Sequence, residues 1–244
     1  MKIVTLGCSF TDNYNGVNKI WPNIVAEHFN ANLVNYGKSG SSNRFAYISL
    51  INHILYNDIP DKVYWLLTEF DRVDILDNKF LTSIDYENNN KFVQYMENMT
   101  IDSNALNNMK AKIKNESKIS KVFSKTPVQF LIDQNYIYIY HVQEICKSYN
   151  IELKIMQGVM PLNCYLQYDK YKVTEAIIAS KYANLLDLSS IIGFPWMEIA
   201  GGFRLTSNKN WFTDYAISKS DPHPSQKGHK YIADIFLGSI PPIP

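Results

Sequence analysis

Three residues that could together form a nucleophilic unit lie at opposite ends of the chain. Ser9 belongs to GCSFTDN, which directly follows the apolar opening MKIVTL, whereas Asp221 and His223 belong to DPHPSQKGH near the other end. A serine hydroxyl attacks poorly at neutral pH unless a base accepts its proton. A carboxylate beside the histidine can hold the imidazole tautomer and stabilise the imidazolium that forms. The pattern predicts acyl transfer with Ser9 as nucleophile, His223 as general base and Asp221 as the group that orients it.

Acyl transfer also needs hydrogen-bond donors aimed at the oxyanion that develops on the substrate. The segment SGSSN, residues 39–43, is rich in small residues and follows the second predicted strand. Since ligands of α/β proteins usually bind at the carboxyl ends of the strands, we expect this segment to supply the donors.

Other chemistry is less well supported by the residue pattern. Asp221, His223 and His229 could in principle bind a metal ion, but no further ligand is grouped with them, so we predict neither a metal nor another cofactor. The three cysteines lie far apart and form no Cys-x-x-Cys pair, which argues against a disulfide framework or a zinc knuckle. We interpret Cys8 as a small buried residue and not as a second nucleophile.

The elements that must position these residues follow from the hydrophobic period. Short apolar runs predict buried strands, and apolar residues at helical spacing predict amphipathic helices between them. Residues 128–149 fit both a strand and a helix, and we predict a helix because a clear strand follows directly. Alternating strands and helices indicate βαβ units and a doubly wound parallel sheet. The predicted strands are 2–6, 32–37, 62–68, 151–156 and 183–188, and the predicted helices are 20–29, 45–55, 128–149, 174–181 and a last one after residue 225.

We predict a single domain over residues 1–244 with two irregular regions. Residues 77–127 are rich in Asn, Lys and Ser, and we interpret them as a mostly helical insertion. Residues 190–220 form a long connection near the predicted site, and loops of this length are usually functional or disordered. The aromatic residues of this connection favour order, either as the core of a lid or as a platform for a sugar.

Composition narrows the possible partners. The net charge of +1 gives no reason to expect nucleic acid or an anionic membrane surface. No apolar run approaches the ~18 residues that a membrane span requires, and no signal peptide is recognisable. We therefore expect a cytoplasmic or virion-associated protein whose partner is a small-molecule or glycan ester.

Over nearly its whole length the chain resembles the SGNH, or GDSL-type, hydrolases. GCSFTDN resembles the nucleophile block, with Ser9 in the serine position and Cys8 where aspartate is usual. NYGKSGSSN resembles the glycine block, and DPHPSQKGH resembles the terminal Asp/His block. The Asp-x-His spacing looks most like that of phage and environmental members. The resemblance implies a flavodoxin-like three-layer α/β/α sandwich around a parallel sheet, metal-free ester hydrolysis, and an oxyanion hole with backbone donors at Ser9 and Gly40.

The third block departs from the family pattern. TEFDR, residues 68–72, stands where Gly-x-Asn-Asp is usual, so Phe70 replaces the asparagine donor. Asn43 is our candidate replacement because it begins a predicted helix, whose terminus favours negative charge. Alternatively, Asn43 only caps that helix. We interpret Glu69 and Arg72 as an ion pair that locks the loop, or else as substrate contacts.

Two classes of function follow from these residues. The first is a serine esterase that acts through an acyl-enzyme, in particular a deacetylase of a carbohydrate or another polar ester. An O-acyltransferase would use the same residues with a sugar hydroxyl in place of water. The second class is a non-catalytic module of the same fold, such as a structural or glycan-binding phage component. The presence of Ser9, Asp221 and His223 together favours the enzyme.

Overall fold

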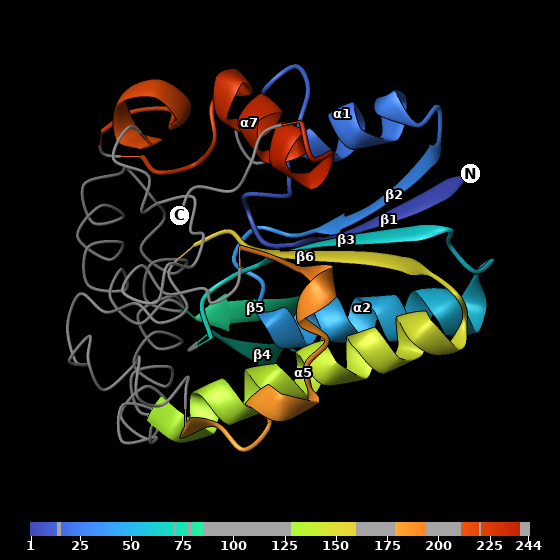
Figure 1. Ribbon diagram of the computed structural model, residues 1–244. Helices are drawn as coiled ribbons and strands as arrows, with labels where there is room; N and C mark the ends of the chain where they lie inside the picture. Colours follow the sequence, from blue (N-terminus) through green and yellow to red (C-terminus); the bar gives the residue numbers. More distant parts are fainter. Residues whose placement is uncertain are drawn as a thin grey trace.

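A five-stranded parallel sheet forms the centre of the protein (Figure 1). The computed structural model describes residues 1–13, 16–70, 72–77, 80–84, 128–159, 179–193, 211–219 and 221–239. The strand order is β2-β1-β3-β6-β7, and each neighbouring pair is parallel. The strands are β1 (Lys2–Gly7), β2 (Asn32–Gly37), β3 (Lys62–Leu67), β6 (Glu152–Gln157) and β7 (Ile191–Ile192).

The central strands are apolar on both faces because helices cover both faces. From the second residue of each to its end, β1 and β3 are buried without interruption. Continuous burial of this kind is typical of parallel sheets in α/β proteins, in contrast to the alternation of a half-exposed sheet. The apolar runs of the sequence therefore predict these two strands correctly.

Two helices pack on each face of the sheet (Figure 1). On one face, α1 (Trp21–His28) lies against α7 (Gln226–Phe236), and the rings of Trp21 and Phe236 lie 4.8 Å apart. On the other face, α2 (Asn43–Tyr56) lies against α5 (Val128–Ser148). The two helix pairs enclose separate hydrophobic clusters, one on each side of the strands. The predicted three-layer α/β/α sandwich is confirmed.

Serine side chains set the first turn of two helices. The Ser42 hydroxyl accepts a hydrogen bond from the Phe45 N–H at the start of α2. The Ser225 hydroxyl accepts one from the Gly228 N–H at the start of α7, as the sequence predicts. Each hydroxyl satisfies an N–H group that has no partner inside its helix.

The last predicted strand, residues 183–188, is wrong. Single 3₁₀ turns form at Ala183–Leu185 and Leu188–Ser190, and only Ile191–Ile192 joins the sheet. The Asp187 carboxylate accepts a hydrogen bond from the Ser189 N–H, and this bond stabilises the second 3₁₀ turn instead of an extended strand. The Gln143 side chain from α5 meanwhile binds the Asp187 N–H and carbonyl, which removes them from strand pairing. Most of the predicted helix 174–181 lies outside the described residues.

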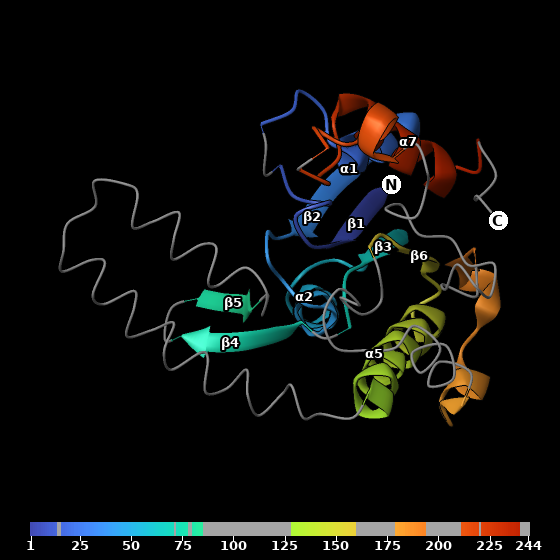
Figure 2. The ribbon, with the colours of Figure 1, turned by 90° about the vertical axis from the view of Figure 1, so that its left-hand side faces the viewer.

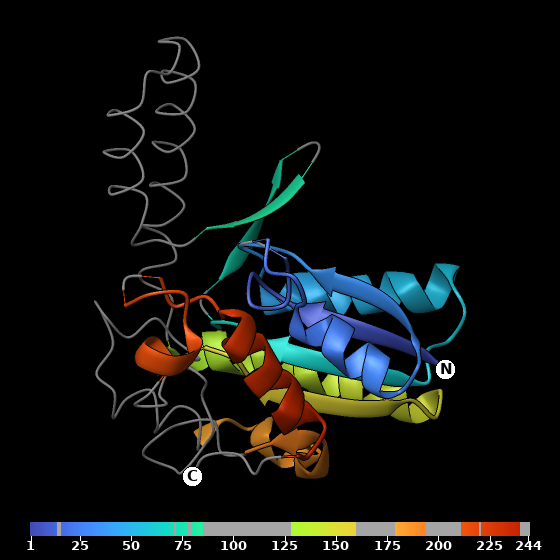
Figure 3. The same cartoon turned by 90° about the horizontal axis from the view of Figure 1, so that it is seen from above.

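The predicted insertion begins with a hairpin and not with a helix. Strands β4 (Val73–Asp77) and β5 (Phe80–Ile84) pair antiparallel, with Val73 opposite Ile84. Figures 2 and 3 show this hairpin standing apart from the central sheet. The helical interpretation is therefore wrong for residues 80–84, where cross-strand pairing with 73–77 outweighs the polar character of the region. Residues 85–127 lie outside the described part of the chain.

The long connection at residues 190–220 is described only at its ends. Residues 194–210 lie outside the described residues, whereas Trp211–Tyr215 form a short π-helical turn that leads toward Asp221. Within the described ranges, no helix is both long enough and apolar enough to cross a bilayer.

Candidate active site

The strand order places the carboxyl end of β1 at a switch point of the sheet. From β1 the chain passes to β2 on one side, and from β2 it passes to β3 on the other side. In open α/β sheets, ligands bind in the crevice that such a reversal creates at the carboxyl ends of the strands. The loops after β1, β2 and β3 meet there, and they carry the three sequence blocks of the N-terminal half.

A tight turn presents Ser9 directly after β1. The Thr11 and Asp12 N–H groups both donate to the Cys8 carbonyl, at 2.9 and 3.0 Å. Gly7 enters this turn with φ +154°, and a Cβ there would lie 2.1 Å from Thr11 Oγ1. Only glycine fits this position, because both the backbone angle and the approach of Thr11 exclude a side chain. The turn places Ser9 at the carboxyl end of β1.

The loop after β2 is hydrogen-bonded to this turn. The Ser39 N–H donates to Asp12 Oδ2 over 3.0 Å, and the Ser41 hydroxyl donates to the Gly7 carbonyl over 3.1 Å. Between them Gly40 adopts φ +76°, the left-handed conformation that glycine favours. Within the described part of the chain, the backbone N–H groups of Ser9 and Gly40 donate to no protein acceptor.

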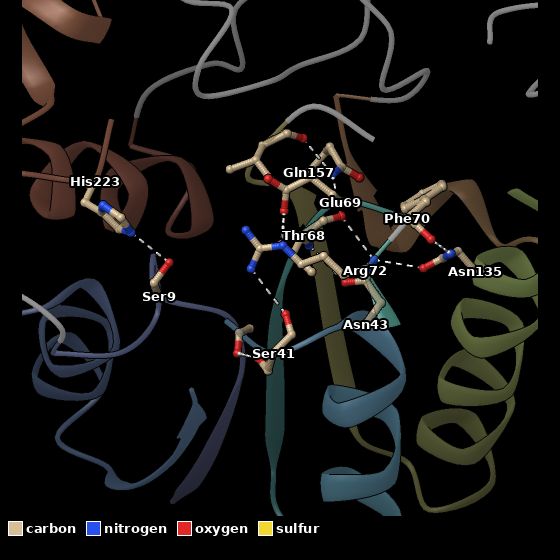
Figure 4. A network of polar contacts seen from close by, with 12 residues as sticks. Ser9, Ser41, Asn43, Thr68, Glu69, Phe70, Arg72, Asn135, Gln157 and His223 are labelled. Carbon is tan, nitrogen blue, oxygen red and sulfur yellow. Dashed lines mark hydrogen bonds and ion pairs between the residues drawn. The ribbon is translucent and has the colours of Figure 1, made fainter. Parts of the chain in front are cut away.

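The three residues predicted to form the nucleophilic unit lie in hydrogen-bonding contact. His223 Nε2 lies 2.9 Å from Ser9 Oγ, and His223 Nδ1 lies 2.6 Å from Asp221 Oδ1. Figure 4 shows the His223 imidazole turned toward Ser9. Because a carboxylate oxygen only accepts, the proton of a neutral imidazole belongs on Nδ1, which leaves the Nε2 lone pair for the serine hydroxyl. This arrangement can remove a proton from Ser9.

Asp221 also fixes the backbone of its partner. Its Oδ1 accepts a hydrogen bond from the His223 N–H over 3.0 Å, in addition to the bond from the ring. The Asp-x-His spacing therefore permits one carboxylate to hold both the backbone and the imidazole of the same residue.

Trp211 and Phe10 contact the nucleophilic unit, although nothing in the sequence pattern distinguishes either residue for this place. The Trp211 Nε1–H donates to the Pro222 carbonyl over 2.8 Å, between Asp221 and His223. The Phe10 ring stacks on Trp211 with centroids 6.0 Å apart and lies 5.4 Å from the His223 ring. Trp211 is fully buried. The aromatic content of residues 190–220 was the available signal, but it did not distinguish this indole from its neighbours.

Asn43 does not supply a donor to the crevice. Its Nδ2 donates to the Thr68 carbonyl over 3.1 Å and to Asn135 Oδ1 over 2.9 Å. Its Oδ1 accepts the Thr68 N–H over 2.9 Å. Both amide hydrogens are therefore used inside the fold. The alternative, a helix cap, is also wrong, because Ser42 is the residue that caps α2.

Phe70 lies in the core, as its apolar side chain requires. It is 2% exposed and packs edge-on against Tyr136 of α5, with centroids 6.4 Å apart. Its carbonyl accepts a hydrogen bond from Asn135 Nδ2 over 2.9 Å. Gln157, at the end of β6, donates to the Thr68 carbonyl over 3.1 Å. These buried polar side chains fix the course of the chain after β3 (Figure 4).

Glu69 and Arg72 form the predicted ion pair. Arg72 Nε lies 2.5 Å from Glu69 Oε2, which also accepts a hydrogen bond from the Thr68 hydroxyl over 2.5 Å. Arg72 Nη1 donates to the Ser41 carbonyl over 3.4 Å. The side chains of both members are largely buried, at 15% and 18% exposure. The pair therefore joins the loop after β3 to the loop after β2.

His229 has a structural partner. Its Nδ1 accepts the Trp21 N–H over 3.3 Å, which satisfies one of the unpaired N–H groups at the start of α1. Burial, together with the proximity of His223, lowers the pKa of His229 to about 4. The side chain is thus neutral at neutral pH and joins α7 to α1. Within the described ranges, no group of three or more His, Cys, Asp or Glu residues could hold a metal ion.

Comparison with known proteins identifies the fold. No family model matches the sequence, and no curated protein matches it. Among solved structures, the chain is similar to the psychrotrophic esterase EstA from Pseudoalteromonas sp., inhibited by monoethylphosphonate (TM-score 0.50, 13% identity, 98% of this chain and 95% of that chain). It is also similar to a member of the lipolytic protein G-D-S-L family from Veillonella parvula DSM 2008 (TM-score 0.45, 14% identity, 98% of this chain and 97% of that chain). A third similar structure is the acetyl xylan esterase AlAXEase (TM-score 0.46, 12% identity, 98% of this chain and 100% of that chain).

These similarities extend over nearly the whole of each chain. Because the sequence identities are only 12–14%, they show a common fold and not a common activity. The protein has the α/β fold of the SGNH, or GDSL-type, hydrolases, and the esterase EstA shares this fold. The expectation drawn from the three sequence blocks is confirmed at this level.

Proposed function

We propose that the protein is a serine esterase that cleaves a polar ester through an acyl-enzyme. The observation that carries this proposal is the continuous contact from Ser9 Oγ through His223 to Asp221. In this arrangement one nitrogen of the histidine can accept the serine proton, while a carboxylate holds the other nitrogen. A protein without catalytic activity would not need this arrangement.

In the first half-reaction, Ser9 Oγ attacks the ester carbonyl carbon while its proton passes to His223 Nε2. The tetrahedral intermediate then expels the alcohol, which takes that proton from His223. In the second half-reaction, water attacks the acyl group, His223 accepts the proton of the water, and release of the acid restores Ser9. Asp221 stabilises the imidazolium in both halves because its carboxylate contacts Nδ1.

The backbone N–H groups of Ser9 and Gly40 are the proposed donors to the oxyanion. The hydrogen bonds from Ser39 to Asp12 and from Ser41 to Gly7 hold the two loops together, so these donors are preorganised. Donors that need no rearrangement during the reaction stabilise developing charge most effectively.

The proposed substrate is an ester of a carbohydrate or a similarly polar alcohol, in particular an acetyl ester. The described loops after β1, β2 and β3 carry polar side chains, among them Asp12, Ser39, Glu69 and Arg72. Such side chains suit a hydroxylated substrate better than a long alkyl chain, which needs an apolar groove to bury its surface.

The test compares wild-type protein with Ser9→Ala, using p-nitrophenyl acetate and a fluorophosphonate that labels activated serines. We expect wild-type turnover and labelling at Ser9, and loss of both in Ser9→Ala with little change in Tm. His223→Ala should be nearly as damaging, and the double variant should be little worse, because members of one nucleophilic unit are strongly non-additive. Absence of wild-type labelling and turnover would instead indicate the non-catalytic module.

Product analysis with acetylated oligosaccharides then separates hydrolysis from transfer. An esterase releases acetate, whereas an O-acyltransferase forms an acetylated acceptor when a sugar is supplied. Sustained transfer in preference to hydrolysis would overturn the assignment of water as the second nucleophile.

A further inference from the structure

Among the described residues, the loop after β3 brings no asparagine side chain to the site. Phe70 points into the core, and Asn43 uses both amide hydrogens on Thr68 and Asn135. Two backbone donors remain, from Ser9 and Gly40. Removal of one oxyanion donor typically costs ~10²–10³-fold in rate, so a third donor at this place would have a large effect.

Arg72 is the charged donor that the structure brings to this place. Its Nη1 donates to the Ser41 carbonyl, and the Ser41 hydroxyl donates to the carbonyl of Gly7, two residues before Ser9. These contacts place the guanidinium beside the loop after β2, which is itself bound to the end of β1. Figure 4 shows the two amino ends of the guanidinium on the side that faces Ser9 and His223.

The guanidinium is held in place by buried groups. Glu69 pairs with its Nε, and the Thr68 hydroxyl fixes the same Glu69 oxygen. The backbone of Thr68 is in turn bound by Asn43 and Gln157. A guanidinium carries five N–H donors, so one arginine side chain can serve several acceptors at the same time. Preorganisation of this kind is what a donor to a developing charge requires.

We infer that Arg72 is the side-chain donor to the oxyanion of the tetrahedral intermediate, in the place of the missing asparagine. This inference rests on the proposed esterase function. The pair with Glu69 compensates the positive charge of Arg72 in the ground state, and hydrogen bonds from a charged donor are roughly twice as strong as neutral ones. Asn43, Thr68 and Gln157 act indirectly, since they hold the loop that carries Arg72.

The experiment compares Arg72→Gln and Arg72→Lys with the matched control Glu69→Gln, which removes the ion pair but keeps the guanidinium. For each we measure kcat and KM for the uncharged ester p-nitrophenyl acetate, the rate of fluorophosphonate labelling and Tm. We expect Arg72→Gln to lose roughly 10²–10³-fold in kcat, with KM little changed and labelling slowed in parallel. Arg72→Lys should retain part of the rate, and Glu69→Gln should lose far less than Arg72→Gln.

A purely structural role for Arg72 predicts a different pattern. Glu69→Gln and Arg72→Gln would then lose equal activity and equal Tm, because both break the same ion pair, and that result would overturn the inference. Wild-type kcat in Arg72→Gln would overturn it as well. If Arg72→Gln fails to fold, Arg72→Ala assayed with and without low, non-denaturing guanidinium decides: recovery of kcat at unchanged Tm supports the inference, and no recovery contradicts it. A wild-type protein without Ser9-dependent turnover refutes the esterase proposal itself and is recognised before any Arg72 variant is made.

Discussion

At the scale of single residues, the geometry around Ser9 depends on an indole that is distant in sequence from the serine. Trp211 donates to the Pro222 carbonyl and stacks on Phe10, so it contacts both halves of the nucleophilic unit. The Ile217 N–H also donates to the His223 carbonyl over 2.9 Å. The residues after Trp211 thus form a support for the Asp221–His223 turn.

We expect Trp211→Phe to keep the aromatic contact with Phe10 and to lose the hydrogen bond to Pro222. One buried hydrogen bond is worth roughly 0.5–1.5 kcal/mol of unfolding free energy, so the protein should remain folded with a slightly lower Tm. A small displacement of His223 should lower kcat by about tenfold or more without a matching rise in KM. The control is Phe212→Leu, since Phe212 is a half-exposed neighbour in the same turn. Equal effects of the two substitutions on kcat would refute a positioning role for Trp211.

At the scale of elements, Asn43 connects α2 to β3 and α5. Asn43→Ala leaves the Thr68 N–H and Asn135 Oδ1 without their partner in a buried place. Each buried polar group without a partner costs about 1–3 kcal/mol, so we expect the free energy of unfolding to fall by about 2–5 kcal/mol, measured by urea denaturation. Ser42→Ala, which removes the hydroxyl that caps α2, should cost about 1 kcal/mol.

The activity of the same Asn43 variant separates a structural role from a catalytic one. Assayed well below its unfolding midpoint, Asn43→Ala should lose much less than the ~10²-fold expected for removal of an oxyanion donor. A loss of kcat that large in fully folded protein would indicate that Asn43 is a donor in the oxyanion hole.

The contact between α7 and α1 gives the stability a defined pH dependence. Burial lowers the pKa of His229 to about 4 in the folded state, from about 6.5 when the chain is unfolded. The unfolded state therefore binds the proton first, so this contribution to stability is complete above pH ~6.5 and is lost progressively as the pH falls toward 4. At ~1.36 kcal/mol per pKa unit the loss amounts to about 3 kcal/mol.

Urea denaturation between pH 7 and pH 4 measures this loss. In His229→Asn the amide oxygen can accept the Trp21 N–H without titrating in this range, so the fall in stability should become shallower. An equally steep fall in wild type and variant would mean that other groups cause the acid destabilisation.

At the scale of the whole molecule, the two cysteines among the described residues are buried, one in each of the two hydrophobic clusters. Cys8 and Cys146 are each 1% exposed, on opposite faces of the sheet. Burial raises the pKa of Cys146 to about 12. Since the thiolate is the reactive form, a disulfide reagent should reach these sulfurs only when the molecule unfolds.

We expect Cys164→Ser, which leaves only these two thiols, to react with 5,5′-dithiobis(2-nitrobenzoate) very slowly in buffer and fully in urea. The rise in reactivity should coincide with the loss of secondary structure, because both faces belong to one cooperative unit. Fast reaction of either thiol in native protein would show that one helical layer opens without the other.

Four of the five strands of the sheet, and the set of residues proposed as the nucleophilic unit, can be predicted from the residue pattern alone. Strands 2–6 and 62–68 are recognisable because a buried parallel strand is apolar throughout. Helix 128–149 is recognisable because a clear strand follows it directly, although its apolar pattern fits both a strand and a helix. Ser9, Asp221 and His223 were recognised as a set by their types and by the turns that carry them. Their roles in turnover remain predictions, whereas the structure shows that their side chains are in hydrogen-bonding contact.

The partner of each polar side chain, in contrast, depends on the packing of the whole fold. Asn43 could be a donor or a cap by its position in sequence, yet its partners are Thr68 and Asn135, which lie 25 and 92 residues away. The paired strands at residues 73–77 and 80–84 and the short strand Ile191–Ile192 likewise depend on pairing with other segments. Hydrophobic period and secondary-structure propensity are local properties of the chain, so they can predict a single helix or strand. A hydrogen bond between distant side chains depends on how the elements pack, and that packing is what turns Trp211 toward Pro222 and Arg72 toward Ser41.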